Sequence, residues 1–151
     1  MDRHEFAARV VERTDRMYRI AWTVLRNSED CRDAMQGAAM KAWEKRHTLR
    51  DERYFDTWLT RILLNECYRI QRKQRRSVPL EEMAEPAILP KDMTLSLALQ
   101  NLPEKLRLPL VMHALEGMSY EEIARALHIS KSTVTGRIQR ARQQLRKELE
   151  E

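Results

Sequence analysis

The side chains best suited to binding another molecule are the basic, amide and hydroxyl groups that follow Ser130. Lysine or arginine can donate to guanine and glutamine can pair with adenine, so these types at a helix start can read base edges in a major groove. Glycine among them allows a close backbone approach, and arginines farther along bind phosphates, which position a protein without specifying sequence. The predicted duplex contacts are Lys131, Ser132, Thr133, Thr135, Gly136, Arg137, Gln139, Arg140 and Arg142.

A second group of basic side chains occupies residues 69–76, where five of the eight residues are lysine or arginine. Cations at a helix C-terminus stabilise the helix dipole by about 0.3–1 kcal/mol each, which explains one or two of them but not five. Each cation that contacts a phosphate adds affinity through counterion release, so the run favours nucleic-acid binding. The net charge of +5 and the pI near 9.5 favour a polyanionic partner as well.

No group of side chains indicates catalysis. The four histidines show no metal-ligand spacing, and the sequence contains neither a glycine-rich phosphate loop nor a convincing pair of nucleophile and base. We therefore predict that the chain is not an enzyme and uses no metal or cofactor. Cys31 and Cys67 form no CxxC pair, and we expect both to be buried thiols in a reducing cytoplasm.

Two short helices with a tight turn between them are predicted to position the duplex contacts. Ser119 followed by Glu122 is a capping box that starts the first helix, and Gly117 is a natural stop for the helix before it. The turn contains His128, and Ser130 is a suitable N-cap for the second helix. A pair of helices joined in this way matches the helix-turn-helix that places its second helix in the major groove. The predicted buried positions are Ile123, Ala124, Leu127, Val134, Ile138, Ala141 and Leu145.

The rest of the chain is predicted to be helical too. Three glycines and a hydrophobic content of 42% favour an all-α protein. Helices are expected over residues 3–26, with Phe6 in the apolar repeat, over 28–45, with Asn27-Ser28 as the break and cap before it, and from about 55 into the basic run. Residues 77–92 hold three of the five prolines, which disfavour a continuous helix. We therefore predict two small helical domains, residues 1–76 and 93–151, joined by a proline-containing linker. No apolar run approaches the ~20 residues that cross a bilayer, so direct membrane insertion is not expected.

The order of these parts resembles the extracytoplasmic function (ECF) class of bacterial RNA polymerase sigma factors over nearly the whole chain. The likeness of the second domain rests on LPE at residues 102–104 with Arg107, EGMSYEEIA at 116–124, TV at 133–134 and RIQRAR at 137–142. The likeness of the first domain rests on Asp33, Gln36, KAW at 41–43, Phe55, WL at 58–59, RI at 61–62 and Asn65 before the basic run.

The resemblance implies a function and a set of contacts. The chain would direct RNA polymerase core to promoters, reading −35 duplex with the second domain and capturing the melted −10 strand with the first. Asp33 and Gln36 would bind polymerase, and an anti-sigma factor is an implied partner beside polymerase and promoter DNA. The implied −10 contacts are His47, Arg50, Arg53, Tyr54, Trp58, Arg61, Asn65, Arg69, Arg72, Lys73, Arg75 and Arg76.

The chain departs from the family pattern in the turn and on the polymerase-binding helix. His128 stands where the family usually has glycine, and we expect it to adopt a positive φ, which histidine tolerates better than most residues. Arg32, Gly37 and Ala39 stand where the family usually has more acid and a bulky aromatic residue. A glycine inside a helix costs about 1 kcal/mol relative to alanine.

The helix that follows residue 54 carries three ambiguous residues. Trp58 at its spacing is more often a core residue than a platform for stacking bases. Asn65, on an otherwise apolar stripe, would need a hydrogen-bond partner. Arg69 stands where the family often has an acid.

Two other classes of protein remain open. A stand-alone helix-turn-helix regulator would bind duplex DNA as a dimer, but the sequence shows no evident heptad zipper or ligand-binding domain. A helical nuclease would need a metal-binding carboxylate cluster, and no such cluster is indicated.

Overall fold

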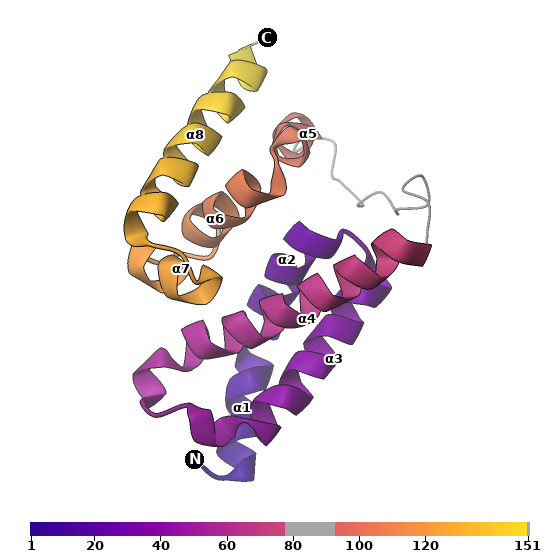
Figure 1. The fold of residues 1–151 in the computed structure, drawn as a ribbon, viewed down its shortest axis with the longest axis vertical. Helices are drawn as coiled ribbons and strands as arrows, with labels where there is room; N and C mark the ends of the chain where they lie inside the picture. Colours follow the sequence, from indigo (N-terminus) through magenta and orange to yellow (C-terminus); the bar gives the residue numbers. More distant parts are fainter. Residues whose placement is uncertain (78–92, 151) are drawn as a thin grey trace. The chain divides into compact units, whose positions relative to one another are not determined.

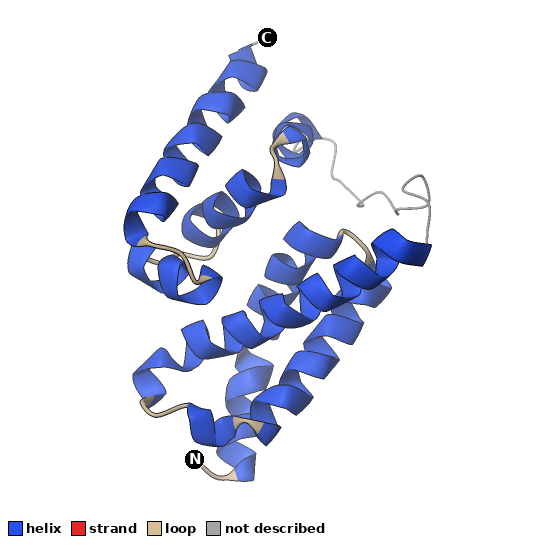
Figure 2. Ribbon diagram, viewed as in Figure 1, coloured by secondary structure: helices blue, strands red, loops and turns tan. Residues whose placement is uncertain are grey.

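The structure is a computed structural model that describes residues 1–77 and 93–150. Every regular element in these residues is a helix (Figure 2), which confirms the predicted all-α class. The chain divides into two compact units, Met1–Ala84 and Glu85–Glu151. The first unit contains α1 (Arg3–Glu12), α2 (Thr14–Leu25), α3 (Ser28–Glu44), the 3-10 turns η1 (Arg46–Thr48) and η2 (Glu52–Tyr54), and α4 (Phe55–Ser77). The second contains α5 (Met93–Asn101), α6 (Glu104–Ala114), α7 (Tyr120–Leu127) and α8 (Lys131–Glu150).

Three helices form the core of the first unit. α2, α3 and α4 pack on one another, and α3 and α4 lie side by side (Figure 1). Because the distance between packed helices depends on the side chains at the contact, small residues on α3 let its neighbours approach closely. The residues of this stripe, none with exposed surface, are Cys31, Ala34, Ala38 and Ala42.

The N-terminal segment differs from its prediction. We expected one helix over residues 3–26, but the structure has two, with Arg13 between them at φ −103° and ψ 9°. The Arg13 amide donates to the Val10 carbonyl oxygen at 3.0 Å. Its guanidinium donates to the Arg9 carbonyl oxygen at 2.9 Å and to the carboxylate of Asp56. The apolar spacing continues across the break without glycine or proline, so we attribute the break to these side-chain contacts.

Local signals elsewhere in the first unit are confirmed. Asn27 caps α3, because its side-chain oxygen accepts from the Asp30 amide at 3.0 Å. Cys31 and Cys67 are both buried, and neither forms a disulfide bond. Burial raises the pKa of the Cys31 thiol to about 11, so this thiol stays protonated and unreactive near neutral pH.

The core of the second unit forms around α8. Its Val134, Ile138 and Ala141 have no exposed surface, and α5, α6 and α7 pack against this helix. α6 continues through Pro109, which is buried, so the proline does not end the helix. Gly117 follows the end of α6 with φ +68°, the left-handed conformation that glycine adopts without strain, as the sequence predicted.

The predicted linker falls mostly outside the described residues. Ser77 is the last residue of α4, and residues 78–92 are not described. The domain bounds of 1–76 and 93–151 therefore stay predictions.

Candidate nucleic-acid interface

α7 and α8 form the predicted helix-turn-helix. The capping box is complete, because the Glu122 amide donates to Ser119 Oγ at 3.1 Å and the Ser119 amide donates to Glu122 Oε1 at 2.9 Å. In the turn, His128 has φ 60° and ψ 42°, which confirms the expected positive φ. The Thr133 amide donates to Ser130 Oγ at 3.1 Å, so Ser130 caps α8 as predicted.

Three of the buried positions predicted for these two helices are wrong. Ile123, Val134, Ile138 and Ala141 are buried as expected, but Ala124, Leu127 and Leu145 are only half-buried. The small residue with almost no exposed surface is Ala126, at 4%. Ala126, and not Ala124, is therefore the small residue that α7 buries.

The predicted duplex contacts all lie on α8, but their side chains differ in how far they are exposed to solvent. The hydroxyl of Thr133 lies 2.8 Å from Ser130 Oγ, and that of Thr135 donates to the Lys131 carbonyl oxygen at 3.1 Å, so both already have local partners. Thr133, Thr135, Gly136 and Arg137 are half-buried. The exposed members of the set are Lys131, Ser132, Gln139, Arg140 and Arg142.

Gly136 lies in α8 among these contacts. The packing around it leaves room for a larger residue. A β-carbon added there would lie 3.8 Å from Nη2 of Arg140, an ordinary van der Waals distance. The absence of a side chain at this position therefore leaves backbone accessible without relieving any crowding inside the unit.

The connecting loop, residues 46–54 between α3 and α4, consists largely of η1 and η2. It brings four of the predicted −10 contacts together beside the start of α4.

On α4, Trp58 and Arg61 are half-buried. Asn65 is exposed, so it does not need the hydrogen-bond partner that a buried position would require. The side chain of Arg76 is outside the described residues. The other exposed members of the set are His47, Arg50, Arg53, Tyr54, Arg69, Arg72, Lys73 and Arg75.

Arg53 in this loop is paired with its neighbour Asp51. Its Nη2 donates to Asp51 Oδ2 at 2.7 Å, and the Arg53 amide donates to Oδ1 at 3.0 Å. These hydrogen bonds lower the pKa of the Asp51 carboxyl from its ordinary value. The pair is exposed and therefore weak, so Arg53 can exchange this partner for a phosphate at little cost.

An aromatic cluster supports the connecting loop from inside the unit. The ring of Phe6 lies edge-on to Trp43 and Phe55, with centroid distances of 5.3 and 6.0 Å. Trp58 lies 5.8 Å from Phe55, and its Nε1 donates to Thr48 Oγ1 at 3.0 Å. Trp58 is thus engaged in packing and in holding the loop. The sequence pattern placed Phe6 only on an apolar helix face and gave no sign of this cluster.

A buried carboxylate connects α3 and α4, and the spacing of apolar residues did not predict its role. Glu66 is only 2% exposed; its Oε2 accepts from Lys41 Nζ, and its Oε1 accepts from Arg69 Nη2 at 3.3 Å. Burial alone would raise the pKa of the Glu66 carboxyl, but the hydrogen bonds from both cations outweigh it and lower that pKa. A β-carbon on Gly37 would lie 2.6 Å from Oε1, so the glycine supplies the space for this carboxylate.

The two units match two known protein families. Residues 10–77 match Sigma-70 region 2, and residues 92–145 match Sigma-70, region 4. The ECF RNA polymerase sigma factor SigW of Bacillus subtilis is 30% identical over 98% of this chain and 90% of its own length. The ECF sigma factor SigM of Mycobacterium tuberculosis is 31% identical over 95% of this chain and 76% of its own length.

The chain belongs to the ECF family of RNA polymerase sigma factors. It is a sigma factor that directs RNA polymerase to promoters, with a region 2 unit and a region 4 unit.

Two solved sigma factors have the same fold as this one. The sigma factor RpoE from Bartonella quintana, in complex with the anti-sigma factor NepR, has a TM-score of 0.83 and 26% identity, covering 97% of each chain. CnrH in complex with the cytosolic domain of CnrY has a TM-score of 0.77 and 26% identity, covering 99% of this sigma factor and 90% of that chain.

The predicted polymerase contacts of this sigma factor lie on the outer face of α3. Asp33 and Gln36 are both exposed, and Met40, one turn farther along the same helix, is 62% exposed. An exposed methionine next to polar groups is typical of a surface that packs against another protein. Over the described residues, no helix is long and apolar enough to span a bilayer.

Proposed function

We propose that this sigma factor holds a promoter at two points, with α8 reading the −35 duplex and the connecting loop with α4 capturing the melted −10 strand. The observation that carries the proposal is the combination of two surfaces in one chain. One is a complete helix-turn-helix whose recognition helix starts with exposed Lys131 and Ser132. The other is a region 2 unit whose loop is exposed, basic and aromatic.

At the −35 element, Lys131, Ser132 and Gln139 are the groups best placed to reach base edges. The guanidinium groups of Arg140 and Arg142 lie farther along α8 and would bind phosphates, which fixes the register on the duplex. These contacts involve intact base pairs and need no opening of the DNA.

At the −10 element, His47, Arg50 and Tyr54 project from the connecting loop and would contact unstacked bases. Arg72 and Lys73 extend the basic surface along α4 and would follow the phosphates of the captured strand. The protein supplies binding and positioning, and the polymerase supplies catalysis, so no active site is needed in this chain.

Two protein partners complete the proposal. RNA polymerase core would dock on Asp33 and Gln36, and an anti-sigma factor would hold the sigma factor inactive in the cytoplasm until it is released. The second partner is supported by the two solved sigma factors of the same fold, one described with the anti-sigma factor NepR and the other with CnrY.

A reconstituted transcription assay tests the proposal. Purified chain and core polymerase should start transcription at a promoter with both elements, and the chain alone should bind that duplex weakly. Tight, dimeric binding without polymerase would instead favour a stand-alone helix-turn-helix regulator.

The polymerase contacts have a sharper test in the double variant Asp33→Ala with Gln36→Ala. Core binding should weaken about tenfold or more, because two exposed hydrogen-bonding groups are lost from one face. Binding of the −35 duplex should stay unchanged. Unaltered core affinity, measured by fluorescence anisotropy of labelled sigma factor, would show that the docking face is elsewhere.

A further inference from the structure

We propose that α1 is a clamp that holds the connecting loop in its binding conformation, with Phe6, Arg9 and Arg13 as positioning residues. This inference rests on the proposed function of the loop in −10 capture. Residues 3–9 of α1 precede the match to region 2, which begins at residue 10. The contacts that α1 makes indicate its role.

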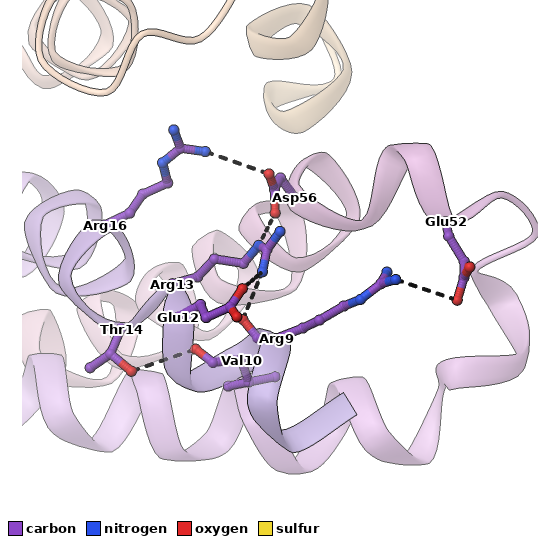
Figure 3. Close-up of polar contacts among 8 residues, drawn as sticks. All are labelled: Arg9, Val10, Glu12, Arg13, Thr14, Arg16, Glu52 and Asp56. Atoms are coloured by element: carbon purple, nitrogen blue, oxygen red, sulfur yellow. Dashed lines mark hydrogen bonds and ion pairs between the residues drawn. The ribbon is translucent and has the colours of Figure 1, made fainter. Parts of the chain in front are cut away.

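Polar contacts connect α1 and the break after it to the loop and to the start of α4 (Figure 3). Arg9 Nη2 lies 3.8 Å from Glu52 Oε1, and Glu52 is part of η2. Arg13 donates to Asp56, which lies in the first turn of α4. Arg16 from α2 approaches the other oxygen of Asp56 at 3.9 Å. Three arginines, from α1, from the break after it and from α2, thus meet η2 and the first turn of α4.

Aromatic contacts connect α1 to both ends of the loop. Phe6 is the one buried residue of α1, and its ring packs on Trp43, before the loop, and on Phe55, directly after it. The guanidinium carbons of Arg9 and Arg13 lie 5.7 and 5.0 Å from the centroid of the Phe55 ring, within the range of cation–π attraction. α1 therefore touches the residues that frame the loop on each side.

These contacts have an energetic consequence for strand binding. A helix of ten residues is marginal in water by itself, so α1 forms because it is docked on this cluster. By the same contacts, α1 restricts the conformations of the loop. A loop that is ordered before binding loses less conformational entropy when it captures a strand. Release of the clamp should therefore weaken the recognition of the correct strand.

A direct phosphate contact is the competing role for these arginines. Arg13 is poorly placed for it, because its side chain is 25% exposed and is committed to Asp56 and to the Arg9 carbonyl oxygen. The two roles predict different results. A lost phosphate contact weakens every strand equally, whereas a disordered loop loses discrimination between strands.

The test compares Arg13→Ala with Arg3→Ala, which removes the same charge from an exposed position at the start of α1, whereas Arg13 directly follows the end of that helix. Each variant is bound to core polymerase and titrated with two fluorescent single strands, one with the −10 sequence of a promoter active in the transcription assay and one scrambled. Arg13→Ala should reduce the ratio of the two affinities about five- to tenfold, the change expected for one charge-assisted positioning hydrogen bond. Arg3→Ala should leave the ratio unchanged.

Glu52→Gln provides a second variant, because its side chain is 58% exposed and its loss does not threaten the fold. The ratio should fall about twofold, as for a weak surface pair. If Arg13→Ala no longer binds core polymerase, which docks on the same unit, the fold of that unit is damaged and Glu52→Gln decides. An unchanged ratio, or an equal loss for both strands, would overturn the clamp. A wild-type protein that prefers neither strand would instead overturn the proposed function of the loop.

Discussion

Gly37 in the region 2 unit and Gly136 in the region 4 unit both lie inside helices, where each costs about 1 kcal/mol relative to alanine. Their surroundings differ. A β-carbon at Gly37 would lie 2.6 Å from a carboxylate oxygen of Glu66, whereas one at Gly136 would lie 3.8 Å from Arg140. The first glycine is required by the inside of the protein. The second is not required by packing, because a β-carbon would fit there at an ordinary distance.

This difference separates two reasons for a helix to carry glycine. The fold dictates Gly37, because the space of a side chain is occupied by the acid that connects α3 and α4. The fold only tolerates Gly136, and we propose that this glycine serves the −35 contact instead. Substitutions at the two positions should therefore change stability in opposite directions.

Gly37→Ala should cause the largest change in the free energy of unfolding. The added methyl would force Glu66 to move, although its oxygens are held by Lys41 and Arg69. We expect the free energy of unfolding to fall by about 1–3 kcal/mol, the range for overpacked interiors, despite the better helix propensity of alanine. Urea denaturation followed by circular dichroism measures the change.

The same substitution in a Glu66→Ala background is the matched control. With the carboxylate removed, the methyl has space, and Gly37→Ala should stabilise the protein by up to about 1 kcal/mol through helix propensity. If the alanine is equally harmful in both backgrounds, crowding against Glu66 is not the reason for this glycine.

The charge of Glu66 should make a smaller, pH-dependent contribution to the free energy of unfolding. Its pKa is lowered in the folded protein from the ordinary value of 4.5, so the folded state binds this proton less readily than the unfolded state. The stabilisation is fully present above pH 4.5 and is lost as the pH falls through the folded-state pKa. Glu66→Gln should lower the free energy of unfolding by about 1–2 kcal/mol at neutral pH, and the difference from wild type should shrink in acid.

Asp51→Asn is the control for this pH experiment. The pKa of Asp51 is also lowered by its hydrogen bonds, but its pair with Arg53 lies on the surface. Added salt should remove any effect of Asp51→Asn on the free energy of unfolding. Glu66→Gln should keep most of its effect, because the Glu66 carboxylate is buried. Equal salt sensitivity of both variants would mean that Glu66 acts as a surface charge.

The sequence predicted the features of this fold that depend on neighbouring residues. The capping box of Ser119 with Glu122, the N-caps Asn27 and Ser130 and the positive φ of His128 all follow from patterns a few residues long, and all are present. From these the all-α class and the helix-turn-helix could be recognised.

Features that depend on distant partners could not be predicted in this way. Arg13 breaks the N-terminal helix through a contact with Asp56, 43 residues away, and Glu66 is neutralised by Lys41, 25 residues away. The spacing of residues along a helix predicts neither of these partners. A glycine at an unfavourable helix position, Gly37, was the one local sign of the buried acid. The individual DNA and polymerase contacts remain predictions, because exposure alone does not identify them.

Gly136→Ala should give the smallest change in stability and the one of opposite sign. Alanine fits without crowding and is the better helix former, so the free energy of unfolding should rise by about 0.5–1 kcal/mol. Affinity for −35 duplex, measured with the polymerase holoenzyme, should nevertheless fall, because the methyl occupies space that the DNA backbone or base edges approach. Gln143→Ala, at an exposed position farther along α8, is the control and should change neither quantity greatly. A more stable protein with undiminished duplex affinity would show that Gly136 serves neither the fold nor the −35 contact, and would remove the contrast with Gly37.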